Sequence, residues 1–407
     1  MTTQRMTERD TIRKLARQVA EIANDESNGV IKQRWRDTNA RRPTDRAPVW
    51  CRPVGCWSEL LPPEAFVCRD PQLRAIEGKL RSVLVKRDID DDEPVAAFWS
   101  VPAVFDVDPP NRYGVDVQKH RTGVVGGAWS YDPPLKSEED FDKLRLPTLT
   151  CNEAETQRRL DFAHELFGEV LPVRRTCGAP GSATLGAAAA DLRGMTEMML
   201  DCAANPELMH RLMAYCRDWT LSAMDQVEPL GLLTPNNDGP MTCSDPLRHV
   251  PADGRLTYED LWVHANSQEF DQVSPAMWEA FCLNCQLPII ERFGASYYGC
   301  CENLTHKIDP VLRIPNLRIF TCSAWTDLDM VIEKAGPSKV IMWRQKASDV
   351  VFPDDDATIR RDLESGLRRL RGCHYQIVLR ELQTLAGHMD RLHVWTAIAK
   401  ELAAKYA

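Results

Sequence analysis

The stretch NLRIFTCSAWTDLDMVIEKAGPSKVIMWRQK, residues 316–346, decides the predicted fold. Its two ends, 316–323 and 339–346, are short apolar runs with the length of buried strands. The segment between them, TDLDMVIEKAG (326–336), is predicted to be a helix. A strand, a helix and a second strand in this order build parallel strands joined by a helical crossover.

The same alternation extends from about residue 137 to the end of the sequence. The other predicted strands are 170–177, 230–238, 294–301 and 375–382, and the other predicted helices are 151–167, 194–228, 274–293, 357–371 and 389–406. These strands follow one another without a Gly-rich fingerprint such as G-x-G-x-x-G, which favours a (β/α)8 barrel over a dinucleotide-binding sheet. We therefore expect an α/β protein with a TIM-type (β/α)8 barrel.

The first part of the chain has a different character. TERDTIRKLARQVAEIAND (7–25) is predicted to be an amphipathic helix. Residues 43–135 are rich in Pro and Trp, which indicates loops and edge strands, and the acidic run DIDDDEP (88–94) is expected to be a solvated turn. We expect residues 1–136 to form a helical and extended N-terminal extension with the first barrel strands. Residues 137–407 would complete the barrel within one domain.

Composition narrows the class of protein. The 407 residues carry a net charge of −9 and are 43% hydrophobic, which is sufficient for a large core. The sequence contains no apolar run near the roughly 20 residues of a membrane helix, and its N-terminus lacks the apolar core of a signal peptide. Fourteen cysteines without an export signal predict reduced thiols in a cytoplasmic protein. The acidic balance argues against nucleic-acid binding.

The most distinctive candidate for a functional site is YYGCCENLTHK, residues 297–307. In a barrel, the chemistry lies at the C-terminal ends of the strands, and this run ends one of them. Thiolate, imidazole and carboxylate groups are zinc ligands. The alternative is a buried structural cysteine pair beside a capping Glu or Asn. The candidate metal ligands are Cys300, Cys301, His306 and, from the next strand, Cys322.

Further polar residues follow other predicted strands or interrupt apolar segments. LWVHANSQEF (261–270) could line a pocket, and the polar run 236–238 could hydrogen-bond a substrate, although Asn and Asp also favour turns. An arginine such as Arg344 could pair with a substrate carboxylate. The candidate catalytic residues are Glu302, Asp238, Asn236 and Glu269. The candidate substrate-binding residues are Trp262, His264, Gln268, Tyr298, Trp343 and Arg344.

The run from SPAMWEAF to KVIMWR (274–344), with its motif YGCCE followed by a histidine, resembles the uroporphyrinogen decarboxylase superfamily. The resemblance is to a divergent branch similar to corrinoid-dependent methyltransferases and demethylases. Residues 55–81 and 375–401 also look like that branch. The resemblance implies a (β/α)8 barrel, in agreement with the count of strands, and a homodimer.

What the resemblance implies for the site is limited. Methyltransferases of this superfamily bind zinc with a His-x-Cys pair on this strand and a later cysteine. Cys301 matches the motif cysteine, but Gly299 stands at the histidine position, so either His306 replaces the histidine or zinc is lost. The later cysteine would be Cys322 or Cys373. The sequence has no corrinoid-binding D-x-H-x-x-G run, so a corrinoid would be carried by a separate protein. It also lacks the R-Q-A-G-R loop, which makes uroporphyrinogen a poor substrate candidate.

Three functions are open. The favoured one is a methyltransferase or demethylase that moves a methyl group between a small molecule and a corrinoid or thiol acceptor, with zinc at the barrel mouth. The second is a cofactor-independent decarboxylase of a small carboxylated substrate. In that case Arg174 or Arg344 would bind the carboxylate and Asp238 would protonate the product carbon. The third is a non-catalytic barrel that binds a small molecule.

Overall fold

The computed structural model describes residues 7–121, 123, 129–249 and 253–407. Its main sheet has six parallel strands in the order β1-β12-β11-β10-β9-β8. The strands of this sheet are β1 (Val49–Cys51), β8 (Trp262–Ala265), β9 (Ala295–Tyr298), β10 (Leu317–Cys322), β11 (Val340–Gln345) and β12 (His374–Leu379). The other strands are β2 (Trp99–Pro102), β3 (Phe105–Asp108), β4 (Gln118–Arg121), β5 (Trp129–Asp132), β6 (Thr148–Cys151) and β7 (Val173–Thr176).

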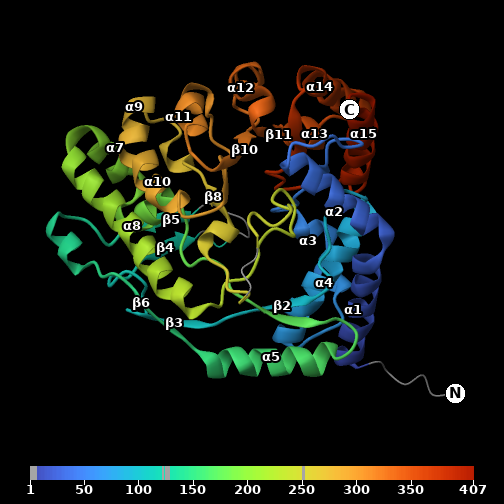
Figure 1. The fold of residues 1–407 in the computed structure, drawn as a ribbon, viewed down its shortest axis with the longest axis horizontal. Coiled ribbons are helices and arrows are strands. Elements are labelled where there is room, and N and C mark those ends of the chain that lie inside the picture. The colour runs from blue at the N-terminus through green and yellow to red at the C-terminus, as the bar shows by residue number, and fades with distance from the viewer. Residues whose placement is uncertain (1–6, 122, 124–128, 250–252) are drawn as a thin grey trace.

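Helices surround the strands (Figure 1). The first eight are α1 (Glu8–Asn24), α2 (Glu26–Asn39), α3 (Trp57–Leu60), α4 (Pro71–Ile89), α5 (Glu153–Phe167), α6 (Leu185–Arg193), α7 (Met195–Ala204) and α8 (Pro206–Val227). The remainder are α9 (Pro275–Trp278), α10 (Asn284–Ile290), α11 (Ile308–Leu312), α12 (Leu328–Ala335), α13 (Ser348–Val351), α14 (Asp356–Arg369) and α15 (Arg391–Lys405). The last helix, α15, packs against β1 and α4, so the end of the chain lies against its beginning.

Alternate residues of the main sheet face two different environments. One set, which includes Val263, Phe320 and Ile377, belongs to the large core between the sheet and the helices. The other set, which includes Trp262, Met342 and Val378, packs on the concave side with Ile31 and Trp35 of α2. This alternation is the ordinary two-residue period of a strand. Helix α2 and the segment around Met241 and Cys243 therefore fill the concave side near the strand N-termini.

The α/β class and the parallel strands with helical crossovers are confirmed, but the expected closed barrel is not observed. Strands β2 and β7 pair with each other in a separate parallel sheet. The predicted strand 230–238 does not form. Just beyond β7, the backbone N–H of Thr234 donates to the carbonyl oxygen of Cys177 at 2.9 Å. The side chain of Asn236 bonds both the backbone N–H and the carbonyl oxygen of Trp262. This segment thus bridges β7 and β8 without forming a ladder.

On the other side of the opening, the free edge of β1 is satisfied by carboxylates. Oδ2 of Asp92 accepts the N–H of Val49 at 2.7 Å, and Asp92 N donates to Val49 O at 2.8 Å. Oδ2 of Asp91 accepts the N–H of Cys51 at 2.9 Å. Because backbone groups at a strand edge need partners, these bonds replace a neighbouring strand, and β2 does not pair with β1.

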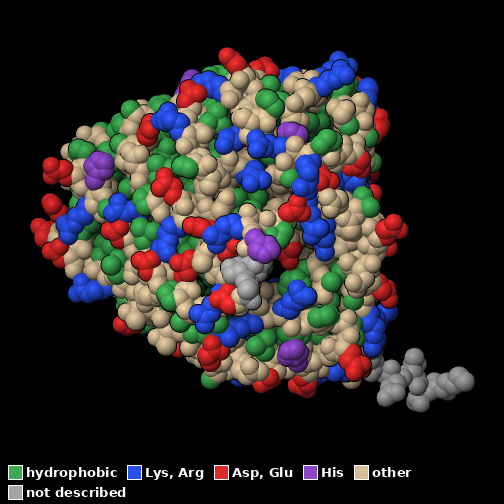
Figure 2. Space-filling view, viewed as in Figure 1, with side chains coloured by type: hydrophobic (Ala, Val, Ile, Leu, Met, Phe, Trp, Pro, Cys, Tyr) green, Lys and Arg blue, Asp and Glu red, His purple; other side chains and the backbone are tan. Residues whose placement is uncertain are grey.

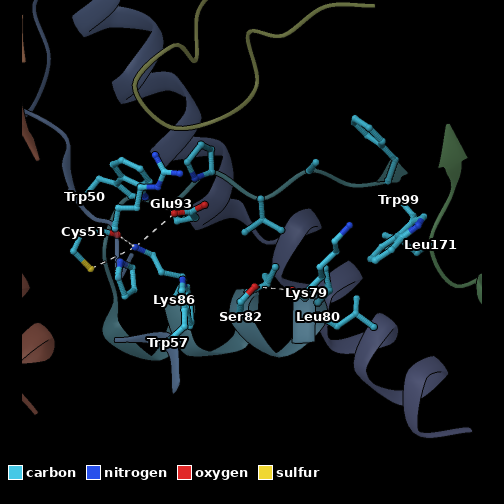
Figure 3. Close-up of a pocket in the computed structure, with 18 residues that line it drawn as sticks. Trp50, Cys51, Trp57, Lys79, Leu80, Ser82, Lys86, Glu93, Trp99 and Leu171 are labelled. Atoms are coloured by element: carbon cyan, nitrogen blue, oxygen red, sulfur yellow. Dashed lines mark hydrogen bonds and ion pairs between the residues drawn. The ribbon is translucent and has the colours of Figure 1, made fainter. Parts of the chain in front are cut away.

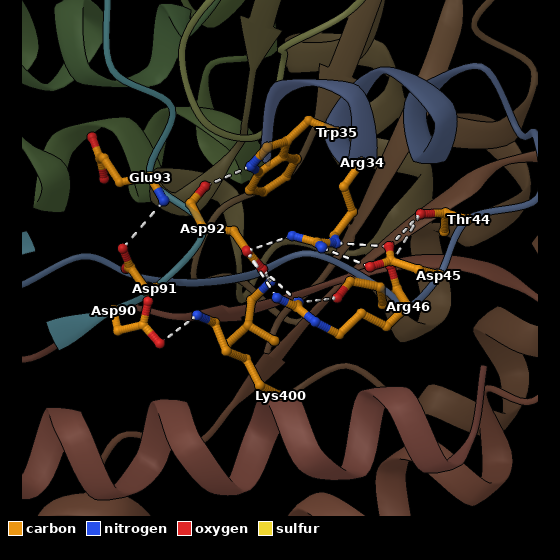
Figure 4. A network of polar contacts seen from close by, with 12 residues as sticks. Arg34, Trp35, Thr44, Asp45, Arg46, Asp90, Asp91, Asp92, Glu93 and Lys400 are labelled. Carbon is orange, nitrogen blue, oxygen red and sulfur yellow. Dashed lines mark hydrogen bonds and ion pairs between the residues drawn. The ribbon is translucent and has the colours of Figure 1, made fainter. Parts of the chain in front are cut away.

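The prediction of a solvated turn at 88–94 is therefore wrong for its central residues. Asp92 is 1% exposed and lies between two arginines, 2.8 Å from Arg34 and 2.6 Å from Arg46 (Figure 4). Trp35 Nε1 donates to Asp92 O at 2.7 Å. The network joins α2 to the segment after α4 and fixes the edge of β1. Sequence alone shows a run of acids, whereas the structure supplies buried arginines to pair with them.

Charged side chains of both signs are intermixed over the face shown in Figure 2. Many of these charges form ion pairs, such as Arg360 with Glu401 at 2.7 Å. Among the helices that the structure describes, none has the length and apolar composition to cross a membrane.

Candidate active site at the C-terminal end of the sheet

The concave face of the sheet changes from apolar to cationic toward the C-terminal ends of the strands. Arg344 follows Met342 by two residues on β11, and Arg380 follows Val378 just after β12. Arg52 lies two residues after Trp50, and its backbone N–H donates to Leu379 O at 2.8 Å. Because strand side chains alternate, all three arginines lie on the same side as the apolar concave set. This end is the one at which barrel-like α/β enzymes carry their chemistry.

Gly299 turns the chain away from β9 and places the two cysteines. Its φ is +107°, a conformation that side chains disfavour, and a Cβ there would lie 2.9 Å from Leu304 and 3.0 Å from Thr321. The carbonyl oxygen of Gly299 lies 3.2 Å from Nε2 of His264. Glycine at this position therefore allows the adjacent Cys300 and Cys301 to lie across the ends of β10 and β11.

Cys300 is surrounded by positive charge. Its Sγ lies 3.5 Å from Sγ of Cys301, 3.8 Å from Nη1 of Arg344 and 3.9 Å from Nη1 of Arg380. The hydrogen bond with Cys301, together with the two guanidinium groups, lowers the pKa of Cys300 to about 5. A lowered pKa favours the thiolate, which is the nucleophilic form of cysteine, near neutral pH.

Cys301 is the partner that keeps its proton. Its Sγ lies 2.9 Å from Oε1 of Glu381, and that oxygen is 3.1 Å from Nη1 of Arg344. The adjacent Cys300, burial and Glu381 raise the pKa of the Cys301 thiol far above its ordinary value. Glu381 has a φ of +62°, which non-glycine residues rarely adopt. Such backbone conformations concentrate at functional sites.

Glu302 holds the cysteine turn in place. It is 3% exposed, and its two carboxylate oxygens accept the N–H groups of Ser267 and Cys300, both at 2.8 Å. Burial raises the pKa of Glu302, and the two backbone hydrogen bonds oppose that rise. The carboxylate is thus a positioning group that joins the turn after β8 to Cys300.

His264 and Tyr297 form the opposite wall. Their rings stack with centroids 4.4 Å apart, and the two residues are paired in the β8–β9 register. Burial, with a contribution from the nearby arginines, lowers the pKa of His264 to about 4. The imidazole is therefore neutral near pH 7, and its Nε2 can donate to Gly299 O. Burial also raises the pKa of the Tyr297 hydroxyl.

Glu269, a candidate catalytic residue, lies in the 3-10 turn after β8. Its Oε2 is buried and has no hydrogen-bond partner among the described residues. Burial, and to a smaller extent the charge of Cys300, raises the pKa of Glu269. A carboxyl group with a raised pKa can hold a proton and release it to a reacting group.

The predicted zinc site was tested against the residues present. In the described parts of the chain, no three His, Cys, Asp or Glu side chains gather as a metal-binding group. Instead, Arg344 lies against both Cys300 Sγ and Glu381, so guanidinium charge stands where a metal cation would. Cys322 is fully buried on the other face of β10, with Sγ near the carbonyls of Ser323 and Thr326, and His306 is exposed. In the described residues, the candidate ligands are therefore not gathered into a zinc site.

The structure brings several predicted residues together and leaves others apart. Cys300, Cys301, Glu302, His264 and Arg344 belong to one cluster, whereas Glu269 lies against Gly186 of α6 and senses only the charge of Cys300. Tyr298 is in the core, bonded to Gln286 at 2.8 Å, and Trp343 packs against Gly366 of α14. Trp262 is buried near α2, and its indole donates to Ser244 Oγ at 3.0 Å. Asn236 bonds the backbone of Trp262, whereas Asp238 and Gln268 are exposed.

Three residues of the cluster were missed by the sequence analysis, namely Arg52, Tyr297 and Arg380, whereas Glu381 stands at the end of the predicted strand 375–382, where polar residues were expected. The three missed residues had a usable signal, because each lies an even number of residues from an apolar concave residue of its own strand. Tyr297 follows Ala295, Arg380 follows Val378 and Arg52 follows Trp50. The position of Glu381 depends on its unusual backbone conformation, which the sequence does not indicate.

Comparisons with known proteins give a fold and no family. No protein-family model matches the chain, and no curated protein matches its sequence. The resemblance to the uroporphyrinogen decarboxylase superfamily therefore stays a prediction. A solved structure of a methyltransferase from Methanosarcina mazei is similar over 91% of this chain and 98% of its own, with a TM-score of 0.50 and 11% identity. At that identity, the likeness is one of fold.

Proposed function

We propose that this protein is a methyltransferase that takes a methyl group from a small anionic substrate, with the Cys300 thiolate as the nucleophile. The single observation that carries the proposal is the position of Cys300 Sγ, beside the thiol of Cys301 and within 3.9 Å of two arginines. A thiolate is held at the end of the sheet where barrel-like enzymes act. The fold shared with a methyltransferase supports this reading.

The proposed step is a displacement at the methyl carbon. The Cys300 sulfur forms a bond to the methyl carbon, the bond from that carbon to its donor atom breaks, and the electron pair stays on the donor atom. A donor atom that carried a positive charge leaves neutral. A donor oxygen leaves as an anion, and the proton of Glu269 can neutralise it.

The arginines explain why we propose an anionic substrate. The Nε atoms of Arg344 and Arg380 are buried and unpartnered among the residues described. Protein atoms cover both, so a ligand would meet this cationic end through Arg380, which is partly exposed, and Arg52, which is exposed. A carboxylate matches a guanidinium in shape and charge.

The final methyl acceptor is proposed to be a corrinoid carried by a separate protein, as the sequence resemblance implies. Zinc stays a prediction that metal analysis of protein purified without chelator can check. Neither group takes part in the step proposed for Cys300.

The test uses methylated carboxylates of three kinds, with the methyl on nitrogen, oxygen or sulfur. After incubation, peptide mass spectrometry should locate one added methyl group on Cys300. Cys300→Ser should abolish the product, and Cys373→Ser, at a half-buried cysteine outside the site, should retain it. Methyl transfer to added cob(I)alamin would report turnover. Failure of all three donors to methylate Cys300, in protein that alkylates normally there, would remove the proposal.

A second candidate function is decarboxylation, which the arginines and the raised pKa of Glu269 also favour. An arginine would bind the carboxylate while Glu269 supplies a proton to the carbon that loses carbon dioxide. Release of carbon dioxide from a small dicarboxylate by the Cys300→Ser variant would favour this candidate over methyl transfer.

A further inference from the structure

A cavity of about 380 Å³ lies in the opening between β1 and β2 (Figure 3). It is bounded by β1, by α4 and by the segment that leads to β2. The opening exists because Asp91 and Asp92 satisfy the edge of β1, so no strand occupies this part of the wall. A volume of this size is in the range of small-molecule sites.

The cavity wall is mainly aromatic. Trp50 and Trp57 lie at one end, and Trp99 lies with Leu171 at the other end (Figure 3). Phe98 also contributes to the lining. Indole and phenyl faces bind flat rings through stacking and edge contacts, which are stronger than contacts with a saturated ring of equal size.

Of the cations that line the cavity, Lys79 lies over the Trp99 ring at the far end, 5.7 Å from its centroid, and Arg52 lies at the end nearest the active site. Lys86 is buried, but Asp91 and Glu93 neutralise it, and Glu93 also accepts from the Trp50 indole. Arg52 is exposed and lines the cavity, and within the described ranges no carboxylate pairs with its guanidinium group. An anionic group on a ligand would therefore meet Arg52.

Arg52 also connects the cavity to Cys300. Its strand pairs with β12, where Trp50 is opposite Val378, so Arg52 is next to Arg380. Neighbouring strands lie about 4.8 Å apart, and Arg380 Nη1 contacts Cys300 Sγ. The charge of Arg52 also acts on His264 across the site. A ligand bound at Arg52 is thus one strand away from Arg380, whose side chain reaches Cys300 Sγ.

We infer that this cavity binds the ring of a flat aromatic carboxylate and that Arg52 binds its carboxylate group. The identification of this ligand as the substrate rests on the proposed function, whereas its binding does not. The inference narrows the substrate class from small anions to aromatic acids.

Calorimetric titration of the full chain tests the inference with three probes: para-methoxybenzoate, its neutral amide and cyclohexanecarboxylate. Wild-type protein should bind the aromatic acid at least about tenfold more tightly than either of the others. Arg52→Gln should weaken binding of the aromatic acid about tenfold and leave the amide unchanged. Arg371→Gln, at an exposed arginine far from the cavity, is the matched control.

A substitution that fills the cavity tests whether the ligand binds there. Val83 of α4 lines the cavity, and Val83→Trp should abolish binding of both aromatic probes. Ser82→Phe, on the next lining residue, is the second variant if the first does not fold. Equal binding of cyclohexanecarboxylate, or unchanged binding in a folded cavity-filled variant, would overturn the inference. Methylation of Cys300 by aliphatic donors with no aromatic binding would leave the proposed function intact. Binding of the aromatic acid without any methylation of Cys300 would support the inference and contradict the proposed function.

Discussion

The Sγ atoms of Cys300 and Cys301 lie 3.5 Å apart and face opposite charges: Cys300 is beside Arg344 and Arg380, and Cys301 is beside Glu381. Here the turn at Gly299 places one sulfur against cations and the other against a carboxylate. The pair therefore divides into Cys300, whose pKa is lowered, and Cys301, which keeps its proton and donates to Oε1 of Glu381.

The first prediction concerns the pH dependence of Cys300 alkylation. Because its pKa is lowered to about 5, the rate with iodoacetamide should stay near its maximum down to about pH 6 and fall as the pH drops through about 5. An ordinary thiol, with a pKa of about 8.5, is less than about 1% ionised at pH 6. Quantitative peptide mass spectrometry at each pH gives the midpoint for Cys300.

A variant identifies the cause of this shift. Cys301→Ala removes the hydrogen bond that contributes most to it, so the midpoint for Cys300 should move up toward the ordinary value. Cys373→Ala should leave the midpoint unchanged. A midpoint near the ordinary value in the wild-type protein would contradict the assignment of Cys300 as the thiolate.

The second prediction concerns Glu302 as a positioning residue. Glu302→Gln replaces one of two accepting oxygens with an NH2 group that would face a backbone N–H. Leaving that N–H buried and unpaired should lower the free energy of unfolding by about 1–3 kcal/mol. The Cys300 midpoint should also shift, because the turn that places the sulfur is loosened. Chemical denaturation and the alkylation profile measure the two effects, and Glu333→Gln, at an exposed glutamate, should change neither. An unchanged alkylation profile in a destabilised variant would show that Glu302 only stabilises the fold.

The sequence predicts the regular part of the fold well. Strands β10 and β11 with α12 between them are confirmed, because apolar runs of strand length and an amphipathic helix alternate there without ambiguity. The opening between β1 and β2 could not be predicted. It depends on Asp91 and Asp92 reaching the edge of β1, and on Arg34 and Arg46 meeting Asp92 from distant positions. Sequence shows these acids only as a charged run.

For the site, sequence indicates which strand ends carry chemistry but not which residue faces inward. Trp343 and Arg344 are adjacent, and both were candidates; the strand alternation directs Arg344 to Cys300 and Trp343 to α14. For the same reason, Tyr298 was predicted to bind substrate, but it lies in the core. Its neighbour Tyr297 is the one that stacks on His264. A shift of one residue exchanges the two faces of a strand, and a single sequence contains no direct measure of that register.

The third prediction compares two carboxylates on the same arginine. Asp92 is 1% exposed and pairs with Arg34 and Arg46, whereas the side chain of Asp45, the other partner of Arg34, is 59% exposed. Asp92→Asn leaves two largely buried guanidinium groups without their shared charge and should cost about 3–5 kcal/mol of stability. Asp45→Asn should cost less than about 1 kcal/mol, because solvent screens that pair. Denaturant titration of both variants gives the two values, and similar losses would contradict a role for Asp92 in fixing the edge of β1.

The fourth prediction concerns the turn that places the cysteines. Gly299→Ala introduces a Cβ that would lie 2.9 Å from Leu304 and 3.0 Å from Thr321, at a φ of +107°. Strain of this kind costs about 1–3 kcal/mol, and relief by movement of the turn would displace Cys300 from the arginines. The alkylation midpoint of Cys300 should therefore rise together with the loss of stability. Gly29→Ala, in the exposed interior of α2 with no atom within 4 Å of the new Cβ, should instead raise stability by about 0.5–1 kcal/mol. If both variants keep the wild-type midpoint while Gly299→Ala is destabilised, the low pKa of Cys300 does not depend on the geometry of this turn.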